Sequence, residues 1–353
     1  MIDSVRGSQM GREIGEIPAV VQRVLDAPDQ LTSAAAVISH ADPRWIMIAG
    51  RGTSDHAAVY AQYLIETHLA LPTGLVKPSV TTVYRTELDW RGGLVLAISQ
   101  SGQSPDVVAV VEAARRSGAL TLAITNEPAS PLAAAADIAL EIHAGRELAV
   151  PATKTYVAEL AVVAALANAI RPTSTLGEGL AALPDALRDT IVRTRDWLSG
   201  AGALAVDAFV AADRALLVSR GFNLATALEL ALKLKETCGL FAEAYSTADF
   251  MHGPLVLARA NVPTLAIRPD GPMGADVDAT VAAVAARGGR LTVFGGPETA
   301  PAAEVLALPH ALPEALTPLL FVVPGQLLVE ATAAGRGLNP DAPAGLGKVT
   351  LTR

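Results

Sequence analysis

Cysteine is almost absent from this chain of 353 residues, in which Cys238 is the single thiol. One cysteine excludes a disulfide within the chain and a zinc site built from several cysteines. Aromatic residues make up only 4% of the chain and charged residues 18%, while apolar residues reach 51%. Such a composition supplies large buried cores and excludes global disorder.

The sequence also lacks a basic excess and any long uninterrupted apolar run. The 27 lysines and arginines are outnumbered by 35 aspartates and glutamates, which gives a formal net charge of −8. Nucleic-acid binding needs a basic patch or stripe and is not expected here. No apolar run reaches the roughly 18 residues of a membrane helix without a polar or turn residue. Residues 1–4 do not begin a signal peptide, so we expect a cytoplasmic protein with no membrane partner.

Short apolar segments alternate with helical segments in the first half, a pattern typical of a parallel sheet covered on both faces. Before them, Pro18 lies in a helical patch at a position where a helix could begin. Strands are predicted at 45–49, 74–76, 81–84, 94–98, 120–125 and 138–142. Helices are predicted at 55–68, 105–117, 130–135 and 154–169.

The same order of elements begins again in the second half. A strand at 215–219, a turn at Arg220 and a helix at 224–238 repeat the first strand, turn and helix, with Arg220 placed over Arg51 at an offset of 169 residues. Further strands are predicted at 264–267 and 291–294, and segment 291–296 corresponds less closely to 94–100. Chance similarity of two strand–turn–helix units is the alternative to a duplication.

The predicted fold class is therefore α/β, with two tandem subdomains that are each a three-layer αβα arrangement around a parallel sheet. The predicted parts are an N-terminal helical segment (1–30), a first domain (31–172), a linker helix (173–200), a second domain (201–336) and a C-terminal active-site tail (337–353).

Residues 50–55, which read GRGTSD, follow the first predicted strand. A dinucleotide-binding turn would need a third glycine where Asp55 stands, so nicotinamide binding is only weakly indicated. Thr53 and Ser54 could offer hydroxyl and amide groups to an anion at the start of the helix. They could equally be an ordinary helix cap.

Residues 99–104, which read SQSGQS, give a stronger signal. Ser99, Ser101 and Ser104 lie between a buried strand and a helix, where open α/β sheets bind ligands. Hydroxyls and helix N-terminal amides can hold a phosphate without a lysine. A simple serine-rich turn is the alternative. The turn at 295–297 in the second half lacks these hydroxyls, which favours one ligand site per chain.

Three charged residues share one stripe of the predicted helix 224–238, because Glu229, Lys233 and Glu236 are spaced four and three residues apart. For Glu229 and Lys233 we expect a solvated face. Glu236 lies at the helix end, away from the favourable N-terminal dipole, and needs a polar partner.

Two further features follow this helix. Glu243 and His252 come next in the chain, and His252 stands before a Gly-Pro turn, so it is expected on a loop. Residues 337–350 contain too much proline and glycine for a helix, and Lys348 lies among them. Such a tail could be a frayed terminus or could close over a site.

Taken together, these stretches resemble the sugar isomerase (SIS) family, and more closely the isomerase half of glucosamine-6-phosphate synthase and its stand-alone relatives. The resemblance runs from about Met10 to Lys348. It rests on the motifs Gly52-Thr53-Ser54, Ser99-Gln100-Ser101-Gly102, Thr153-Lys154, Ala231–Glu236, Ala242-Glu243-Ala244, His252-Gly253-Pro254 and Leu346-Gly347-Lys348.

The resemblance implies a role for each matching residue. Glu236 matches a base that shuttles a proton between C1 and C2, and Lys348 a lysine that forms a Schiff base with the open-chain ketose. His252 matches a residue that helps to open the sugar ring and is lent by the second subunit of a homodimer. Val150 matches a position that touches the sugar by its backbone. The positions matching the phosphate ligands are Thr53, Ser99, Gln100, Ser101 and Ser104.

Three positions depart from the family pattern. Arg51 replaces a small or thiol residue, Ala152 replaces a serine that helps to hold the sugar, and Gly347 stands for an alanine. The synthase also begins with a glutaminase domain that has an N-terminal cysteine, whereas this chain begins with Met1. We therefore expect no glutamine hydrolysis.

The function that the resemblance implies is conversion of glucosamine 6-phosphate to fructose 6-phosphate and ammonia, with no metal or cofactor. Alternatives are an isomerase or deglycase acting on another sugar phosphate, such as a glycated amino acid phosphate. A third alternative is a non-catalytic sugar-phosphate sensor. Transcriptional sensors carry an N-terminal DNA-binding domain, for which residues 1–30 are too few, so an enzyme is favoured.

Overall fold

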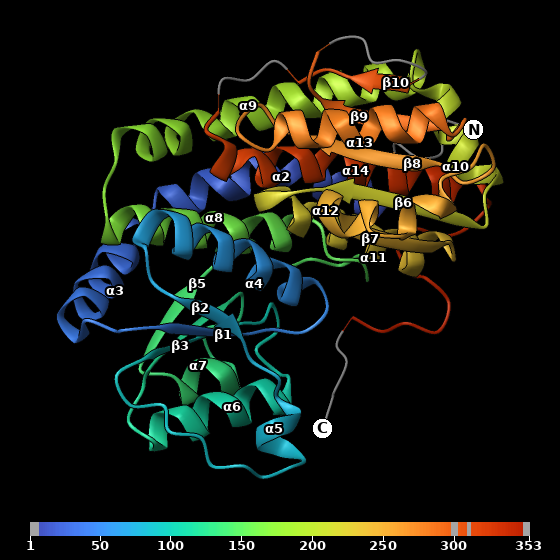
Figure 1. Cartoon of the computed structure of the whole chain (residues 1–353). Coiled ribbons are helices and arrows are strands. Elements are labelled where there is room, and N and C mark those ends of the chain that lie inside the picture. Colours follow the sequence, from blue (N-terminus) through green and yellow to red (C-terminus); the bar gives the residue numbers. More distant parts are fainter. Residues whose placement is uncertain (1–6, 298–302, 309–311, 349–353) are drawn as a thin grey trace. The chain divides into compact units, whose positions relative to one another are not determined.

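A computed structural model describes residues 7–297, 303–308 and 312–348 of the chain (Figure 1). The chain divides into two compact units, each with its own sheet, and each is described by itself. Unit 1 consists of Met1–Pro18, Leu148–Thr153 and Ala182–Leu346, and unit 2 consists of Ala19–Glu147, Lys154–Ala181 and Gly347–Arg353.

Unit 2 contains a parallel five-stranded sheet in the order β2-β1-β3-β4-β5. Its strands are β1 (Ile46–Ala49), β2 (Thr73–Leu75), β3 (Leu94–Ile98), β4 (Leu120–Thr125) and β5 (Ile138–Glu141). Its helices are α3 (Pro28–Ala41), α4 (Thr53–Leu64) with a π-helical extension (Ile65–Leu69), α5 (Ser79–Thr82), α6 (Pro105–Arg116), α7 (Pro131–Ala135) and α8 (Lys154–Ile170). Helices α4 and α8 cover one face of this sheet, and α6 and α7 cover the other (Figure 1).

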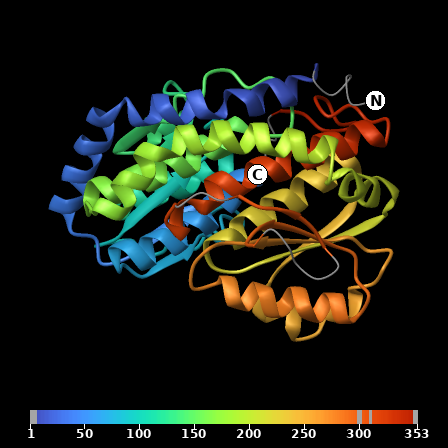
Figure 2. The same cartoon turned by 90° about the horizontal axis from the view of Figure 1, so that it is seen from above.

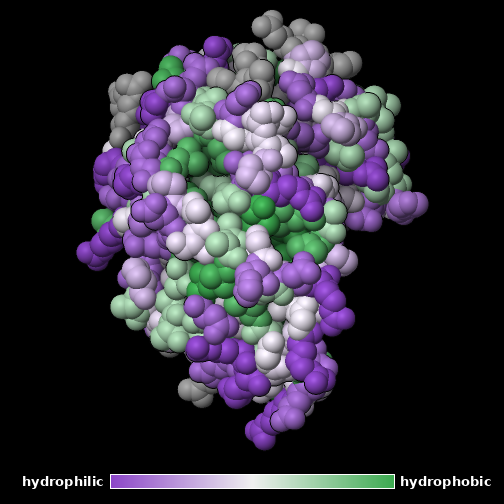
Figure 3. Space-filling model, turned by 90° about the vertical axis from the view of Figure 1, so that its left-hand side faces the viewer, coloured by the Kyte–Doolittle hydropathy of each residue, from purple (hydrophilic) through white to green (hydrophobic). Residues whose placement is uncertain are grey.

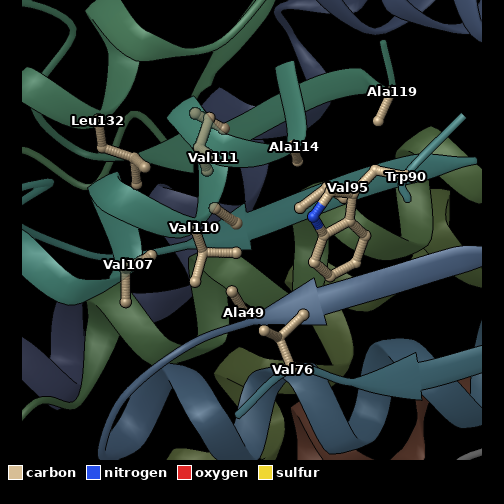
Figure 4. Close-up of a cluster of buried hydrophobic side chains, with 12 residues drawn as sticks. Ala49, Val76, Trp90, Val95, Val107, Val110, Val111, Ala114, Ala119 and Leu132 are labelled. Carbon is tan, nitrogen blue, oxygen red and sulfur yellow. The ribbon is translucent and has the colours of Figure 1, made fainter. Parts of the chain in front are cut away.

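The hydrophobic core on the α6 side is built from the apolar stripe of that helix. Val107, Val110, Val111 and Ala114 are fully buried and recur at helical spacing. They pack with strand residues such as Val95 (Figure 4). Strand β3 is buried at every position, as expected for a central parallel strand. This packing fixes the carboxyl end of β3 and the start of α6 relative to each other.

Unit 1 contains a second parallel sheet in the order β10-β9-β8-β6-β7. Its strands are β6 (Arg214–Ser219), β7 (Phe241–Ser246), β8 (Thr264–Arg268), β9 (Leu291–Gly295) and β10 (Ala303–Leu306). Its helices are α10 (Ala203–Ala211), α11 (Leu224–Cys238), α12 (Thr247–Met251), α13 (Gly274–Ala286) and α14 (Thr317–Gly335), with 3-10 turns at Gly221–Asn223, Pro254–Leu257 and Glu314–Leu316. Helices α2 (Gln9–Leu25) and α9 (Ser174–Ser199) have residues in both units. Helix α13 covers one face of the sheet, with α11 and α14 on the other (Figure 2).

The two sheets have the same topology. Numbered by appearance within its own unit, each has the strand order 2-1-3-4-5. The predicted α/β class with two repeats is therefore confirmed. The finer correspondence of 94–100 with 291–296 was wrong, because β3 takes the position of β8, and β9 that of β4. The turn equivalent to residues 99–104 is thus the one at 269–273.

Several local predictions also differ from the structure. The strand predicted at 81–84 is wrong, because this region forms the short helix α5 after Pro78. Pro18 lies inside α2 instead of at a helix start. No element was predicted at α3, β7, β10, α10, α12, α13 or α14. Strand β7 was missed because its residues are mostly half-buried and include a charge, and α14 because two prolines interrupt its apolar pattern.

One helix in the described part of the chain, Glu314–Gly335, is long and apolar enough to cross a membrane by length and composition. Of its most apolar window, 89% is buried inside the protein. It packs against α11 and α10, as a core helix does.

Polar side chains cover much of the face shown in Figure 3, with apolar groups between them.

Candidate active site

The strand order of unit 2 indicates where a ligand would bind. In a 2-1-3-4-5 sheet the connections leaving β1 and β3 run to opposite faces, and ligands bind where these two carboxyl ends diverge. The turn after β1 contains Thr53, and the turn after β3 contains the other predicted phosphate ligands. The sheet therefore brings all five predicted phosphate positions to one edge.

The turn after β3 has a buried Ser99 and half-buried Ser101 and Ser104, and its first two serine hydroxyls accept bonds from amides of the same turn. Gly102 has a φ of +61°, and a Cβ there would overlap the Ser130 hydroxyl, so this position requires glycine. The Gly102 amide donates to Ser99 Oγ at 3.2 Å, and the Gln103 amide donates to Ser101 Oγ at 3.3 Å. Ser104 is the N-cap of α6, but its side chain makes no capping bond. The segment has the chemistry of an anion cradle.

The turn after β1 contains two hydroxyl residues, Thr53 and Ser54, which differ in burial. Thr53 is the first residue of α4, follows Gly52 and is partly exposed. Ser54 is buried and donates to Glu159 Oε1 at 2.8 Å. Its hydroxyl therefore anchors α4 to α8, whereas the half-buried Thr53 is the phosphate ligand that the sequence predicts in this turn.

The charged stripe of α11 is buried, so the expectation of a solvated face for Glu229 and Lys233 was wrong. Both side chains are almost completely inaccessible, because α14 and the sheet cover this side of α11. Lys233 Nζ lies 3.4 Å from Glu229 Oε1 and donates to Glu236 Oε2 at 2.5 Å. A buried ammonium between two carboxylates satisfies the pairing that buried charges need.

Glu236 is the most accessible member of this group of three, with 27% of its side chain exposed. The Lys233 ammonium is the polar partner that the sequence analysis required for a carboxylate near a helix C-terminus. Glu243, the next carboxylate, lies on β7 and faces Lys235 Nζ at 4.0 Å. Glu236 thus differs from Glu243 in being held by a buried cation.

Val150 and His252 are also in unit 1. The Val150 amide donates to the Asp341 carbonyl at 2.8 Å, which leaves the Val150 carbonyl as its backbone group for a ligand. Glu13 holds the same segment by accepting from the amides of Leu148 and Ala149 at 2.5 and 3.2 Å. His252 lies in an exposed turn after α12.

Lys348 forms an ion pair that no sequence motif indicated. Its Nζ donates to Glu147 Oε2 at 2.6 Å, and the Glu147 side chain is fully buried. Glu147 also accepts from the amide of Thr155 at 3.1 Å and from its hydroxyl at 2.7 Å. The two bonds from Thr155 therefore hold the Glu147 carboxylate in place independently of Lys348. The two partners are 201 positions apart in the chain, so no local sequence pattern indicated this pair.

The tail that carries Lys348 is anchored upstream. The Asp341 carboxylate accepts from the Gln9 amide at 2.9 Å and from the Met10 amide at 2.7 Å, and so caps α2. The last residues of the predicted active-site tail, 349–353, lie outside the described residues.

Cys238 is the one thiol of the chain, and burial raises its pKa to about 12. A thiol of this kind is not a nucleophile at neutral pH. Among the described residues, no group of three or more His, Cys, Asp or Glu side chains is placed to hold a metal ion.

The sequence pattern of the SIS domain matches residues 40–169 and 208–317, one match over each sheet. Together the two matches cover more than half of the chain. The chain belongs to the SIS-domain family.

Among curated SIS relatives, glutamine–fructose-6-phosphate aminotransferase (isomerizing) of Methanothermobacter thermautotrophicus is 34% identical over 343 residues, which cover 96% of this chain and 56% of the relative. The chain thus spans about half the length of the curated relatives it matches. A solved candidate phosphosugar isomerase from Silicibacter pomeroyi DSS-3 is 36% identical with a TM-score of 0.85, covering 95% of this chain and 100% of that one. Glucosamine-6-phosphate deaminase from Thermotoga maritima has a TM-score of 0.77 over 98% and 100% of the two chains, but at 22% identity it shows the fold alone.

The predicted site residues are divided between the two compact units. Unit 2 carries the five phosphate positions and Lys348, whereas unit 1 carries Val150, Glu236 and His252. Glu147, Glu13 and Lys233 are the functional candidates that sequence reasoning missed. Each supports a predicted residue from a distant or buried position.

Proposed function

We propose that this SIS protein is a phosphosugar isomerase, and that it converts glucosamine 6-phosphate to fructose 6-phosphate and ammonia. The observation that carries the proposal is the accessible carboxylate of Glu236, held by the buried Lys233 ammonium. The hydroxyl cradle at the switch point of the first sheet supports a phosphorylated substrate. The names of the relatives above 30% identity, an isomerizing fructose-6-phosphate aminotransferase and a candidate phosphosugar isomerase, support the substrate class.

Glu236 performs the proton transfer in this proposal. It takes the proton from C2 of the open-chain amino sugar and returns it to C1, which turns the aldehyde and amine into a ketimine. A single carboxylate between both carbons can carry out both steps, and such catalysis contributes about 10²–10⁴-fold. The phosphate binds far from the reacting carbons and orients them.

Lys348 completes the reaction. The Lys348 ammonium gives a proton to the ketimine nitrogen, and the resulting amine attacks C2 and displaces ammonia. Water then hydrolyses the lysine imine to the ketose. Overall, one water is consumed and one ammonia released. Glu147 positions the lysine through the 2.6 Å ion pair. His252 assists ring opening.

A screen of sugar phosphates for ammonia release and ketose formation tests the reaction. With glucosamine 6-phosphate, equal amounts of ammonia and fructose 6-phosphate are expected. Ketose without ammonia from another sugar phosphate would indicate a plain isomerase, and release of an amino acid would indicate a deglycase. Binding without any turnover would indicate a sensor.

Ser101→Ala is expected to raise KM with little change in kcat. Loss of one hydrogen bond to a charged group costs about 1.5–3 kcal/mol, which is about tenfold or more in KM. Steady-state kinetics measure the effect. Ser117→Ala, at the opposite end of α6, is the matched control and should leave KM unchanged. An unaltered KM in the Ser101 variant would show that residues 99–104 do not bind the phosphate.

We also propose a homodimer in which His252 serves the active site of the partner. The large apolar side chains near it, Met251, Val256 and Leu257, are exposed, as is typical of an interaction surface. Inactive His252→Ala and Glu236→Gln chains should regain activity when co-refolded, because one of the two sites in each heterodimer is intact. No recovery in verified heterodimers would mean that each chain supplies its own histidine.

A further inference from the structure

An arginine–aspartate pair bridges the switch point in both repeats. Arg51, after β1, donates from Nε to Asp106 Oδ2 at 2.7 Å, and its Nη2 lies 2.6 Å from the same oxygen. Arg220, after β6, donates from Nη1 to Asp276 Oδ1 at 2.9 Å. Both aspartates lie in the first turn of the helix that follows the third strand of their sheet. The pair is therefore a repeated element of the fold.

The surroundings of the two pairs differ. Asp106 follows the N-cap Ser104 by two residues, so the Arg51 pair stands directly beside the hydroxyl cradle. In the second sheet the equivalent turn, 269–273, reads PDGPM and has no hydroxyl. There the Glu314 carboxylate packs so closely on Gly271 that it leaves no room for a Cβ. Only the first repeat combines the arginine with groups that bind an anion.

The two arginine–aspartate pairs also differ in how deeply the aspartate is buried. The Asp106 side chain is 1% exposed, whereas that of Asp276 is 39% exposed. A hydrogen bond from Thr247 and the Arg220 guanidinium hold the pKa of Asp276 below its usual range. Asp106 instead places a buried negative charge beside the cradle, where it would oppose a phosphate. Arg51 neutralises that charge.

Arg51 retains donors for a ligand. Its contacts within the described residues use Nε and Nη2, and 45% of its side chain is exposed. A guanidinium has five N–H donors in a planar fork that suits phosphate oxygens. With Nε and one Nη2 hydrogen directed at Asp106, the Nη1 group remains for an anion.

We propose that Arg51 is a further phosphate-binding residue of this site, positioned by the buried Asp106, and that it selects for ligands carrying a phosphate dianion. The inference rests on the proposed phosphate cradle. It gives the phosphate site a cation beside its hydroxyl groups.

The test is binding of inorganic phosphate to the full chain, measured by isothermal titration calorimetry, together with the kinetics of the sugar phosphate. Arg51→Gln should raise the Kd for phosphate and KM by about tenfold or more, since charged hydrogen bonds are lost, while kcat stays within about twofold. Arg220→Gln removes the equivalent pair in the second repeat and should change neither Kd nor KM. Thermal unfolding confirms that both variants are folded.

The double variant Arg51→Gln/Asp106→Asn separates direct binding from mere charge neutralisation. Its Kd should stay weak if Arg51 contacts phosphate, and a return to the wild-type Kd would overturn the proposal. An unchanged Kd in Arg51→Gln, with a weakened one in Ser101→Ala, would reject Arg51 but keep the cradle. If both variants bind phosphate as the wild type does, the cradle itself is wrong and the inference falls with it.

Discussion

Glu236→Gln is expected to lower kcat by about 10²–10⁴-fold, the usual contribution of a general base. The amide keeps the shape of the side chain but cannot take a proton from C2 at neutral pH. KM should change little, because the phosphate provides the binding energy elsewhere. The fold should survive, since Lys233 keeps Glu229 as a partner at 3.4 Å. Steady-state kinetics and thermal unfolding measure both effects.

The matched control for this variant is Glu243→Gln. Glu243 is the next carboxylate along the chain, but its partner Lys235 is 4.0 Å away and both side chains are half exposed. It should retain kcat within about twofold, as expected for a surface ion pair. If Glu236→Gln kept a normal kcat and Glu243→Gln lost its kcat, the general base would be Glu243.

Lys348→Arg is expected to abolish turnover, with a loss of about two orders of magnitude or more in kcat. Arginine can keep an ion pair with the buried Glu147, but it remains protonated and cannot form an imine. Borohydride reduction in the presence of fructose 6-phosphate should trap a covalent adduct on wild-type Lys348 and none on the variant. Mass spectrometry of the digested protein locates the adduct.

Lys235→Arg provides the control for the trapping experiment. Lys235 is an accessible lysine of α11, and its replacement should leave both the adduct on Lys348 and the turnover intact. An adduct that forms on other lysines but never on Lys348, together with full turnover of Lys348→Arg, would show that Lys348 has no chemical role.

Local sequence patterns predicted much of the framework of this protein. Strands β3 and β4 and helix α11 were predicted with the bounds that the structure has. Continuous apolar runs, glycine turns and helical spacing act over a few residues, so they can be recognised without knowing the fold. The same holds for the serine-rich turn after β3, whose position between strand and helix already indicated an anion site.

Local sequence patterns did not predict the burial of side chains that are covered by an element far away in the chain. Glu229 and Lys233 have the spacing of a surface ion pair, and they are buried because α11 packs against the sheet and against helix α14. That helix was missed because Pro318 and Pro324 interrupt its apolar pattern, although Pro318 lies in the first turn, where a missing amide costs nothing.

The sequence by itself determined the α/β class, its repetition, and the residue types that a phosphosugar chemistry would use. The tertiary structure decided which strand of one repeat matches which strand of the other, because strand order depends on pairing across the sheet. It also decided that Lys348 meets Glu147 and that Arg51 meets Asp106, partners 201 and 55 residues apart. Ion pairs of this kind form only after the chain has closed long loops and buried one partner, and neither event leaves a local pattern in the sequence.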